Sequence, residues 1–360
     1  MSSVVKPYYL PLSFSEAVCV PTNVQRTKSF WIFISFLSFF VLWSILATIM
    51  DYYLHMCKTY KTKATTAVRA FLAFSFYSNG AALLNVSPLK EGILRSLASI
   101  RFISMTWVAA GHSIAAATLS ESLLPTAALW NPLLSTTISN GFLSVDTFFL
   151  LSGILVAYLF FKSRPSLKFV KNPITWVLYY VHRYLRLTPP MMLFIWFYVI
   201  TLPFTNGPWI AAVPMDKRLG AVQGRLRGCQ QHWWRDMLYI NNFFTDSEDC
   251  YGITWYLAVD MQLYIVAPAF LIALYISPLV GYTVLLLCSG ASVVYTYLIT
   301  YRDDLPAISL TKFRDRNGEL FSTEFYKLPW TRCPPYLIGI GVGYFLLKSK
   351  QGDRKFLRWR

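Results

Sequence analysis

The sequence predicts an all-α, polytopic membrane protein with about seven transmembrane helices. Hydrophobic residues make up 55% of the 360-residue chain and charged residues only 14%, and the mean hydropathy is +0.44. Apolar windows of about 20 residues, the length that crosses a bilayer as a helix, recur along the chain. Basic residues gather in separate clusters between these windows, as the positive-inside rule describes. A soluble globular domain is excluded by this composition.

Seven windows are candidate spans because each is apolar over roughly the length of a bilayer-crossing helix. The last window is short and contains Gly339, Gly341 and Gly343. The fourth begins at Pro189-Pro190, which a first helical turn tolerates. The windows cover residues 30–50, 98–118, 141–161, 188–204, 254–276, 279–300 and 336–347.

The charge pattern predicts the orientation of these spans. Three alternate connections, 51–95, 162–186 and the tail 348–360, are rich in Lys and Arg, whereas 119–140 contains neither. Because basic connections stay in the cytosol, we expect an outside or lumenal N-terminus and a cytosolic C-terminus, in the plasma membrane or endoplasmic reticulum. The net charge of +16 fits membrane lipids as partners. No nucleic acid is expected as a partner, because no nucleic-acid-binding motif accompanies the basic residues.

Cysteine placement agrees with this orientation. Cys229 and Cys250 share one predicted outer loop, in which they enclose Trp233 and Trp234. Outer cysteines of secretory-pathway proteins tend to pair, so a Cys229–Cys250 disulfide is expected, with two free thiols as the alternative. Closing a loop of this size would add about 3 kcal/mol of stability.

The most informative polar residues are Arg101 and His112, which share one predicted span. Their spacing of eleven residues is close to three helical turns, so both lie on one stripe of the helix, ~16 Å apart along its axis. Titratable groups are costly in hydrocarbon and usually mark function there. The stripe therefore combines a cation near the cytosolic boundary with a proton carrier deep in the span.

Two carboxylates are expected at the depth of His112. Asp146 and Asp260 each lie five or six residues below the outer start of a predicted span, ~7–10 Å from the boundary at the helical rise. A carboxylate bonded to one imidazole nitrogen would fix the tautomer and make the other nitrogen a better base. We therefore predict that His112 is catalytic and that Asp146 or Asp260 orients it.

Each of these residues also has a structural interpretation. His112 can be a packing histidine bonded to a carbonyl, Asp146 a helix cap, and Asp260 the counter-ion of a nearby arginine. Ser152, followed by Gly153, is either a reactive hydroxyl that contacts substrate or part of a small-residue packing notch.

The cytosolic ends of the spans are basic. Arg101 lies near the inner end of its span, and Arg183 and Arg186 border the next helix pair. Guanidinium forks suit phosphates, so these three arginines are the predicted binding site for a phosphorylated or nucleotide-bearing donor. The alternative for Arg183 and Arg186 is the ordinary basic bias of cytosolic connections.

Two motifs, the Arg-x10-His string from Arg101 to His112 and the later GFLSVDTFFLLSG, stand in order along the chain. Together they resemble the acyltransferase-3 family of membrane O-acyltransferases. The strings HRYLRLTPP, WWRDMLYINNF, CYGITWYLAVDMQLY and RCPPYLIGIGVGY resemble its animal branch, the nose-resistant-to-fluoxetine-like proteins. The matches run in order from about residue 95 to 347.

The resemblance implies transfer of an acyl group, commonly from acyl-CoA, to a hydroxyl group of a lipid or carbohydrate acceptor. His112 matches the essential histidine of the family and Arg101 its paired arginine. Trp255, Asp260 and Gln262 match a carboxylate-bearing string, which makes Trp255 and Gln262 candidate substrate contacts. No bound cofactor or metal is implied, and acyl-CoA is the expected co-substrate. Animal members are associated with lipid and drug handling, so a transporter or lipid-handling protein without catalysis is the alternative function.

The resemblance also suggests how the chain is divided. Residues 1–28 resemble the end of a cysteine-rich outer domain, which leaves Cys19 without an evident partner, and residues 29–96 hold the first span and a basic cytosolic segment. Residues 97–347 form the acyltransferase-3-like membrane domain, and 348–360 a basic cytosolic tail. Family members continue for several more spans, so an inactive truncated paralogue is a further alternative.

Overall fold

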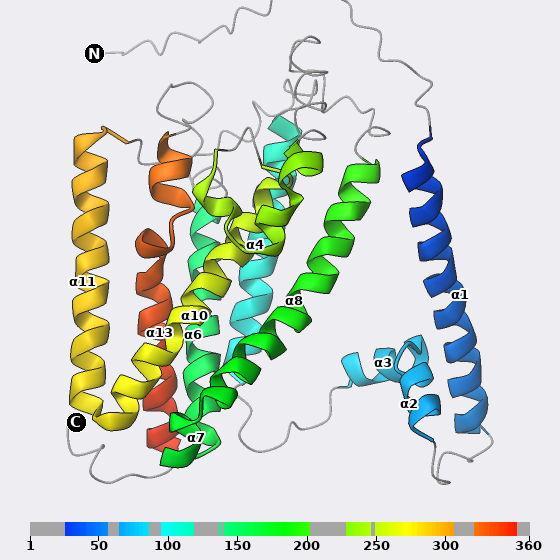
Figure 1. The fold of residues 1–360 in the computed structure, drawn as a ribbon, viewed down its shortest axis with the longest axis horizontal. Helices are drawn as coiled ribbons and strands as arrows, with labels where there is room; N and C mark the ends of the chain where they lie inside the picture. The colour runs from blue at the N-terminus through cyan, green and yellow to red at the C-terminus, as the bar shows by residue number, and fades with distance from the viewer. Residues whose placement is uncertain are drawn as a thin grey trace, which may run out of the picture.

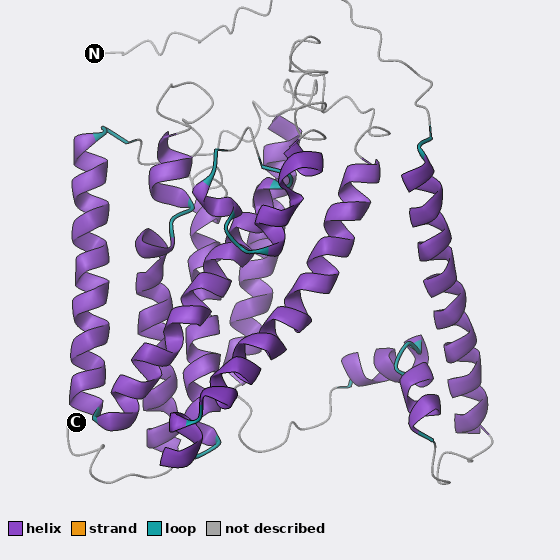
Figure 2. Cartoon of the chain, viewed as in Figure 1, coloured by secondary structure: helices purple, strands orange, loops and turns teal. Residues whose placement is uncertain are grey.

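The computed structural model describes residues 26–56, 65–85, 95–118, 137, 140–201, 228–245, 249–305 and 320–350. Every regular element in these ranges is helical, which confirms the predicted all-α class (Figure 2). The predicted outer segment 1–28, with Cys19, and the basic tail 348–360 fall almost wholly outside these ranges. Seven helices have 19 residues or more: α1 (Lys28–Met56), α4 (Arg95–Thr118), α6 (Ser144–Lys162), α8 (Pro173–Thr201), α10 (Trp255–Ile276), α11 (Pro278–Arg302) and α13 (Pro329–Lys350).

Shorter helices connect the long ones at both ends of the bundle (Figure 1). Among the described residues, four stretches, those of α1, α6, α10 and α11, are long and apolar enough to cross a membrane. The total of about seven spans therefore stays a prediction for α4, α8 and α13. The short helices are α2 (Thr66–Leu72), α3 (Phe76–Leu83), η3 (Asn140–Leu143), α7 (Leu167–Lys171), a helix over 228–237, η6 (Asn241–Phe243), η7 (Gly252–Thr254) and the π-helix η9 (Phe321–Tyr326).

The closest packing in the bundle joins α6 to α13. A Cβ atom on Gly153 would lie 2.2 Å from the carbonyl oxygen of Tyr336, and one on Gly339 would lie 2.3 Å from that of Leu150. Both distances are far below a van der Waals contact, so only glycine allows the two backbones to approach this closely. The sequence left Ser152-Gly153 open between a reactive and a packing role, and the structure assigns the packing role to Gly153.

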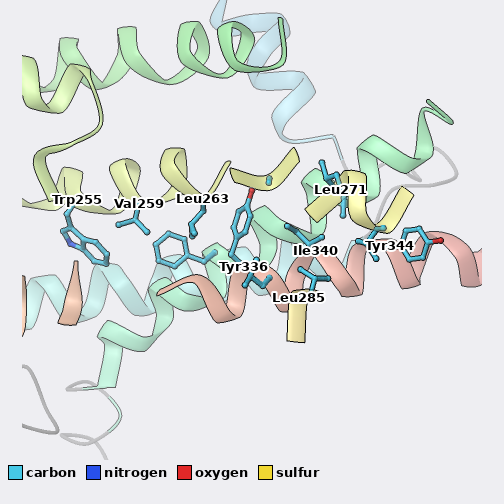
Figure 3. Packing of buried hydrophobic residues seen from close by; sticks show 13 residues of the cluster. Trp255, Val259, Leu263, Leu271, Leu285, Tyr336, Ile340 and Tyr344 are labelled. Atoms are coloured by element: carbon cyan, nitrogen blue, oxygen red, sulfur yellow. The ribbon is translucent and has the colours of Figure 1, made fainter. Parts of the chain in front are cut away.

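The apolar core fills the space between this helix pair and α10 and α11. Phe149, Leu271, Tyr336 and Ile340 are fully buried there, and Figure 3 shows the α10 and α13 side chains interleaving along the contact. Leu285 of α11 closes the cluster from the other side of α13. Burial of each large side chain contributes roughly 1.5–3 kcal/mol, so these four helices form the rigid frame on which the polar side chains are placed.

Two helices, α8 and α13, begin seven residues or more before their apolar windows. Helix α8 starts at Pro173 and runs through Pro189 and Pro190, and α13 starts at Pro329 and runs through Pro334 and Pro335. An internal proline removes a backbone donor and frees a carbonyl one turn before it. In α13 the carbonyl of Trp330, which Pro334 leaves without its helical partner, accepts hydrogen bonds from Ser292 of α11 and from Cys333. A neighbouring helix therefore compensates for the proline, which a local sequence window does not reveal.

Helix α1 stands at the edge of the bundle and carries α2 and α3 at its C-terminal end (Figure 1). The buried carboxylate of Asp51 accepts hydrogen bonds from the Ser75 hydroxyl at 2.6 Å and from the backbone N–H of Ser78 at 3.2 Å. Ser75 is the N-cap of α3, so Asp51 holds the start of that short helix. Toward the other end of α1, Phe33 packs edge-on against Trp196 of α8, with ring centroids 4.7 Å apart.

The predicted Cys229–Cys250 disulfide is confirmed. It joins the 228–237 helix to the segment before α10, and both cysteines are buried. This is the disulfide end of the bundle, and α7 marks the opposite end, here called the α7 end (Figure 1). The cross-link fixes the chain at the point where it enters α10, which has more buried residues than any other described helix.

Candidate functional site

A buried ion pair lies where α6, α8 and α10 meet. Arg183 of α8 donates through Nη2 to Oδ2 of Asp260 on α10, and the two side chains are 16% and 9% exposed. The same Nη2 lies 3.4 Å from the Ser152 hydroxyl of α6. The guanidinium also lies over the ring of Tyr264, 4.0 Å from its centroid. Three residues that the sequence singled out separately are thus neighbours in the fold.

Polar atoms around this ion pair are left without hydrogen-bond partners. Among the described residues, Arg183 Nε, Asp260 Oδ1 and the Tyr336 hydroxyl are all buried and unpaired. Tyr336 lies within electrostatic range of both charges, and Figure 3 shows it reaching from α13 toward α10. Buried unsatisfied polar groups are rare and call for a water, an ion or a ligand. The α6–α8–α10–α13 junction, here called the central polar cluster, is therefore the leading candidate for a functional site.

A second ion pair joins α13 to α6 nearer the disulfide end. Arg332 donates through Nη1 to both carboxylate oxygens of Asp146, at 3.2 and 3.1 Å, and through Nε to the backbone carbonyl of Tyr326 at 3.0 Å. Its guanidinium lies 4.4 Å from the centroid of the Tyr326 ring. Both carboxylates that the sequence placed at one depth are thus paired with arginines.

Helix α4 presents its two predicted site residues differently. Arg101 and His112 are both exposed, and Arg101 lies within electrostatic range of the Tyr256 hydroxyl on α10. Within the described ranges His112 has no hydrogen bond or ion pair. The expected contact between His112 and Asp146 or Asp260 is therefore not formed in this structure. The physical reason is competition, because a guanidinium is a stronger partner for a buried carboxylate than a neutral imidazole.

The position predicted for Arg183 also needs correction. The sequence placed Arg183 and Arg186 in a cytosolic connection, whereas both lie inside α8, ten residues or more from its first residue Pro173. Arg186 is exposed, and Arg183 is turned inward to Asp260. The earlier start of α8 explains the difference, because the apolar window began only at residue 188.

The remaining predicted contacts have structural partners. Gln262 donates to the Tyr239 carbonyl at 2.7 Å and exchanges hydrogen bonds with the Asn242 amide at 2.7 and 3.1 Å. Trp255 is buried against the ring of Tyr326, with centroids 4.7 Å apart. Both residues belong to α10 and connect it to segments at the disulfide end. A substrate contact by either residue stays a prediction.

Two residues of these clusters, Arg332 and Tyr336, were not expected from the sequence. The predicted boundary at residue 336 left Arg332 in an outer loop and Tyr336 at the first position of a span. Arg101 stands out in the sequence because it lies inside an apolar window that also holds a histidine, whereas Arg332 lies four residues before its window. The observed start of α13 at Pro329 is what places Arg332 within a helix. Tyr336 has no comparable pattern, since tyrosine is common in this sequence, with 23 occurrences.

A buried polar network lies under the disulfide. Asp236 of the 228–237 helix accepts a hydrogen bond from the Thr254 hydroxyl at 2.5 Å, and Asn241 donates to the same hydroxyl at 2.8 Å. Nearby, Lys327 and Asp249 form an ion pair at 2.7 Å in which both side chains are 4% exposed. Burial raises the pKa of Asp236 to about 6, with a smaller contribution from the charge of Asp249. This network lies outside the long helices and connects three segments of the chain.

Fold and site together define a class: a helical integral-membrane protein that carries buried charges within its bundle. A family profile described as an acyltransferase domain matches residues 94–360. The chain is 32% identical over 312 residues to nose resistant to fluoxetine protein 6 of Caenorhabditis elegans. It is 28% identical over 273 residues to regulator of hypoxia-inducible factor 1 of the same organism. The chain belongs to the acyltransferase-3 family.

The coverage of these relatives is partial. The first alignment includes 81% of this chain and 36% of the relative, and the second 69% of this chain and 50% of the relative. The chain thus spans about a third to a half of the length of the curated relatives that it matches. No solved structure matches it.

Proposed function

We propose that the chain is an integral-membrane acyltransferase that moves an acyl group from acyl-CoA to a hydroxyl group of a lipid or carbohydrate acceptor. The family supports acyl transfer in general, and the central polar cluster is the observation that carries the proposal to this chain. Charged side chains inside a membrane bundle are expensive and are kept mainly for function. Here Arg183, Asp260 and Tyr336 retain unpaired buried atoms, which provide contacts for a polar substrate group.

In the proposed reaction His112 is the general base. Its imidazole takes the proton of the acceptor hydroxyl, the oxygen attacks the thioester carbonyl, and the C–S bond breaks to release the CoA thiolate. The imidazolium then returns the proton to that thiolate. General-base catalysis of this kind contributes roughly 10²–10⁴-fold in rate.

The donor is assigned to the α7 end of the bundle. Arg101, on the same stripe of α4 as His112, is exposed and forms no ion pair within the described ranges, which suits a phosphate ligand. Arg186, exposed on α8, would assist it. Asp260 and Asp146 act as positioning residues that hold Arg183 and Arg332. With the donor side cytosolic, the N-terminus is outside or lumenal and the C-terminus cytosolic, in the plasma membrane or endoplasmic reticulum.

The test uses the full chain purified into nanodiscs with labelled acyl-CoA and a lipid extract as acceptor. We expect labelled product and release of free CoA thiol. His112→Ala should lower turnover by at least ~10²-fold while the protein still inserts and elutes as a single species. His182→Ala is the matched control, because His182 is an exposed histidine of α8 outside the proposed machinery. Turnover like that of the wild type by His112→Ala would refute this mechanism.

Transport without chemistry is the second candidate function. Buried arginine–carboxylate pairs within spans, such as Arg183–Asp260 and Arg332–Asp146, also occur in proton-coupled transporters. Movement of a labelled lipid between liposome leaflets without release of CoA thiol would support transport over acyl transfer. The same purified protein serves both assays, so the two functions are separated directly.

A further inference from the structure

A cavity of about 300 Å³ lies at the disulfide end, and none of its lining residues belongs to the central polar cluster. It is bounded by η3, by the end of α11, by η9 and by the first turn of α13. Its apolar walls include Phe142, Leu305, Phe321 and Phe325, and its polar lining residues are Asn140, Thr300 and Arg332. A small, largely apolar chamber with a few polar groups is the usual form of a small-molecule site.

Arg332 gives this cavity its chemistry. The side chain is 7% exposed, and its Nε and Nη1 are used by Tyr326 and Asp146. Its Nη2 is buried and has no hydrogen-bond partner among the described residues. A guanidinium carries five N–H donors, so the two on Nη2 are left for a group that the protein itself does not supply. A buried donor without a partner costs roughly as much as a lost hydrogen bond, which favours a ligand or an ordered water there.

The charge balance limits what this ligand can be. Asp146 already neutralises Arg332 through a two-oxygen contact. A second anion would leave a net negative charge in an apolar chamber, and desolvating an uncompensated charge is expensive. A neutral oxygen, as in a carbonyl or hydroxyl group, accepts from Nη2 without that cost.

We propose that the Arg332 cavity binds a compact neutral molecule that combines an apolar, preferably aromatic, body with one carbonyl or hydroxyl oxygen. The oxygen accepts from Arg332, and the body packs among Phe142, Phe321 and Phe325. The volume of about 300 Å³ equals roughly ten liquid water molecules at ~30 Å³ each. It therefore accommodates a body of one or two rings rather than a long acyl chain or a nucleotide.

The wall of the cavity has a further property of ligand sites. Phe321 and Phe325 belong to η9, a six-residue π-helix, and the Lys327 N–H closes it by bonding to the Ser322 carbonyl at 3.1 Å. π-Helical turns are rare and occur frequently at functional sites. Here the widened turn places the two rings four residues apart along one wall of the chamber.

The proposal does not depend on acyl transfer, because it predicts binding that is measured without acyl-CoA. The probe is benzophenone, whose carbonyl is both the acceptor and the photoreactive group. On irradiation the carbonyl takes a hydrogen atom from a nearby C–H bond, and the two carbon radicals join, so the carbonyl becomes an alcohol covalently linked to the protein. The full chain in nanodiscs is irradiated with the probe, and the labelled peptides are identified by mass spectrometry.

We expect labelling to concentrate on peptides that contain Leu305 or Phe321–Tyr326. Excess acetophenone, which keeps the carbonyl, should suppress it, whereas ethylbenzene, which lacks the oxygen, should compete at least ~10-fold less well, because a hydrogen bond to a charged donor is lost. Thr300→Phe fills the chamber and should reduce labelling there about tenfold or more. Thr283→Phe is the matched control, because Thr283 is exposed on the same helix α11.

Two results would overturn the proposal. The first is labelling at this site that ethylbenzene suppresses as well as acetophenone does, because the Arg332 donor would then be irrelevant. The second is labelling spread over exposed helix faces and unchanged by Thr300→Phe, because the probe would then report the lipid phase only. Should Thr300→Phe not fold, Asn140→Trp fills the same chamber from η3 and carries the same expectation.

Discussion

Helices α10 and α1 are both long and apolar, but the fold uses them in opposite ways. In the most apolar 18-residue window of α10, 56% of the residues are buried, whereas in that of α1 the share is 11%. Helix α10 lies between α6, α8, α11 and α13 and carries Asp260. Helix α1 contacts α8 through a few aromatic rings and exposes most of its surface. Apolarity alone thus identifies a membrane helix without showing whether protein or lipid surrounds it.

Polar side chains follow the same division. In the core, Arg183 and Arg332 are paired with carboxylates from other helices. On α4, Arg101 and His112 are exposed. A core arginine must be neutralised because its surroundings have a low dielectric constant. Arg101 lies within two turns of the first residue of α4, where a long side chain reaches lipid headgroups and water. The core arginines therefore contribute to the architecture, and the exposure of Arg101 and His112 is what the proposed function requires of them.

The largest effect is expected from a substitution that disrupts the close packing of α6 against α13. Gly339→Leu would place a side chain against the backbone of α6, where even a Cβ atom lies 2.3 Å from the Leu150 carbonyl. Because backbone cannot move aside as a side chain can, we expect more than the ~1–3 kcal/mol typical of overpacking and loss of a folded, monodisperse protein. Size-exclusion chromatography in detergent measures the outcome. Gly290→Leu is the control, since a Cβ atom at that position would have nothing within 4 Å. If the two variants behave alike, the close α6–α13 contact is not what holds the core together.

Breaking the central ion pair should have the next largest effect. Asp260→Leu leaves Arg183 buried without its counter-ion, and removal of one partner of a buried pair costs ~3–5 kcal/mol. Thermal unfolding in detergent should show this loss, and the double variant Asp260→Leu with Arg183→Met should recover part of it. Arg302→Gln breaks a pair whose arginine is 71% exposed, and we expect no measurable change there. If the double variant is no more stable than Asp260→Leu alone, the loss does not come from an uncompensated charge.

Removing the disulfide shows how much of the stability at this end comes from the cross-link rather than from packing. Cys229→Ser with Cys250→Ser opens the loop between them and should cost about 3 kcal/mol, since a loop of this length regains chain entropy when unfolded. The change is measured as a fall in the unfolding midpoint and as its loss of sensitivity to reductant. Cys333→Ser is the control, because Cys333 is a free thiol in this structure. Reductant sensitivity that persists in the double serine variant would show that another cysteine carries the effect.

The stability of the disulfide end should also depend on pH, through the buried carboxyl group of Asp236. Burial holds the pKa of Asp236 at about 6, above the ordinary value near 3.9. At a pH between these two pKa values, Asp236 keeps its proton in the folded protein and has lost it in the unfolded chain. The Asp236 contribution is therefore full below about pH 4 and is lost as pH rises to about 6, a change on the order of 2–3 kcal/mol. Unfolding midpoints measured from pH 4 to 7 should show this fall.

Substitution identifies the group responsible for this titration. Asp236→Asn keeps an oxygen that accepts from Thr254 and should flatten the pH dependence, leaving the variant more stable than the wild type above pH 6. Asp304→Asn removes an exposed carboxylate and should retain the fall. A steep fall that survives in Asp236→Asn would assign the titration to a different residue.

The smallest effect is expected on α1. Leu42 is 57% exposed, and exposed substitutions away from special features usually change stability by no more than ~0.5 kcal/mol. Leu42→Ala should therefore leave the unfolding midpoint unchanged in detergent. A shift as large as that of Leu271→Ala, at a fully buried position of α10, would mean that protein rather than lipid covers this face of α1.

The sequence alone identified the helical membrane class, the family and the disulfide, because each leaves a local or compositional pattern. Apolar length predicts a span, cysteines in one outer loop predict a pair, and the Arg-x10-His string carries the resemblance. The same patterns placed the starts of α8 and α13 too late, because prolines interrupt both helices. In α13 the freed Trp330 carbonyl accepts from Ser292 of a different helix, which no local window reveals.

Only the tertiary structure decided which charges neutralise one another. Depth along each helix suggested that Asp146 and Asp260 surround His112, but depth fixes one coordinate, and the rotation of each helix fixes the rest. The glycine contacts of α6 with α13 set that rotation and place Arg332 against Asp146, while the packing of α8 on α10 places Arg183 against Asp260. These contacts join residues up to 186 positions apart in the chain, a separation that no local pattern encodes.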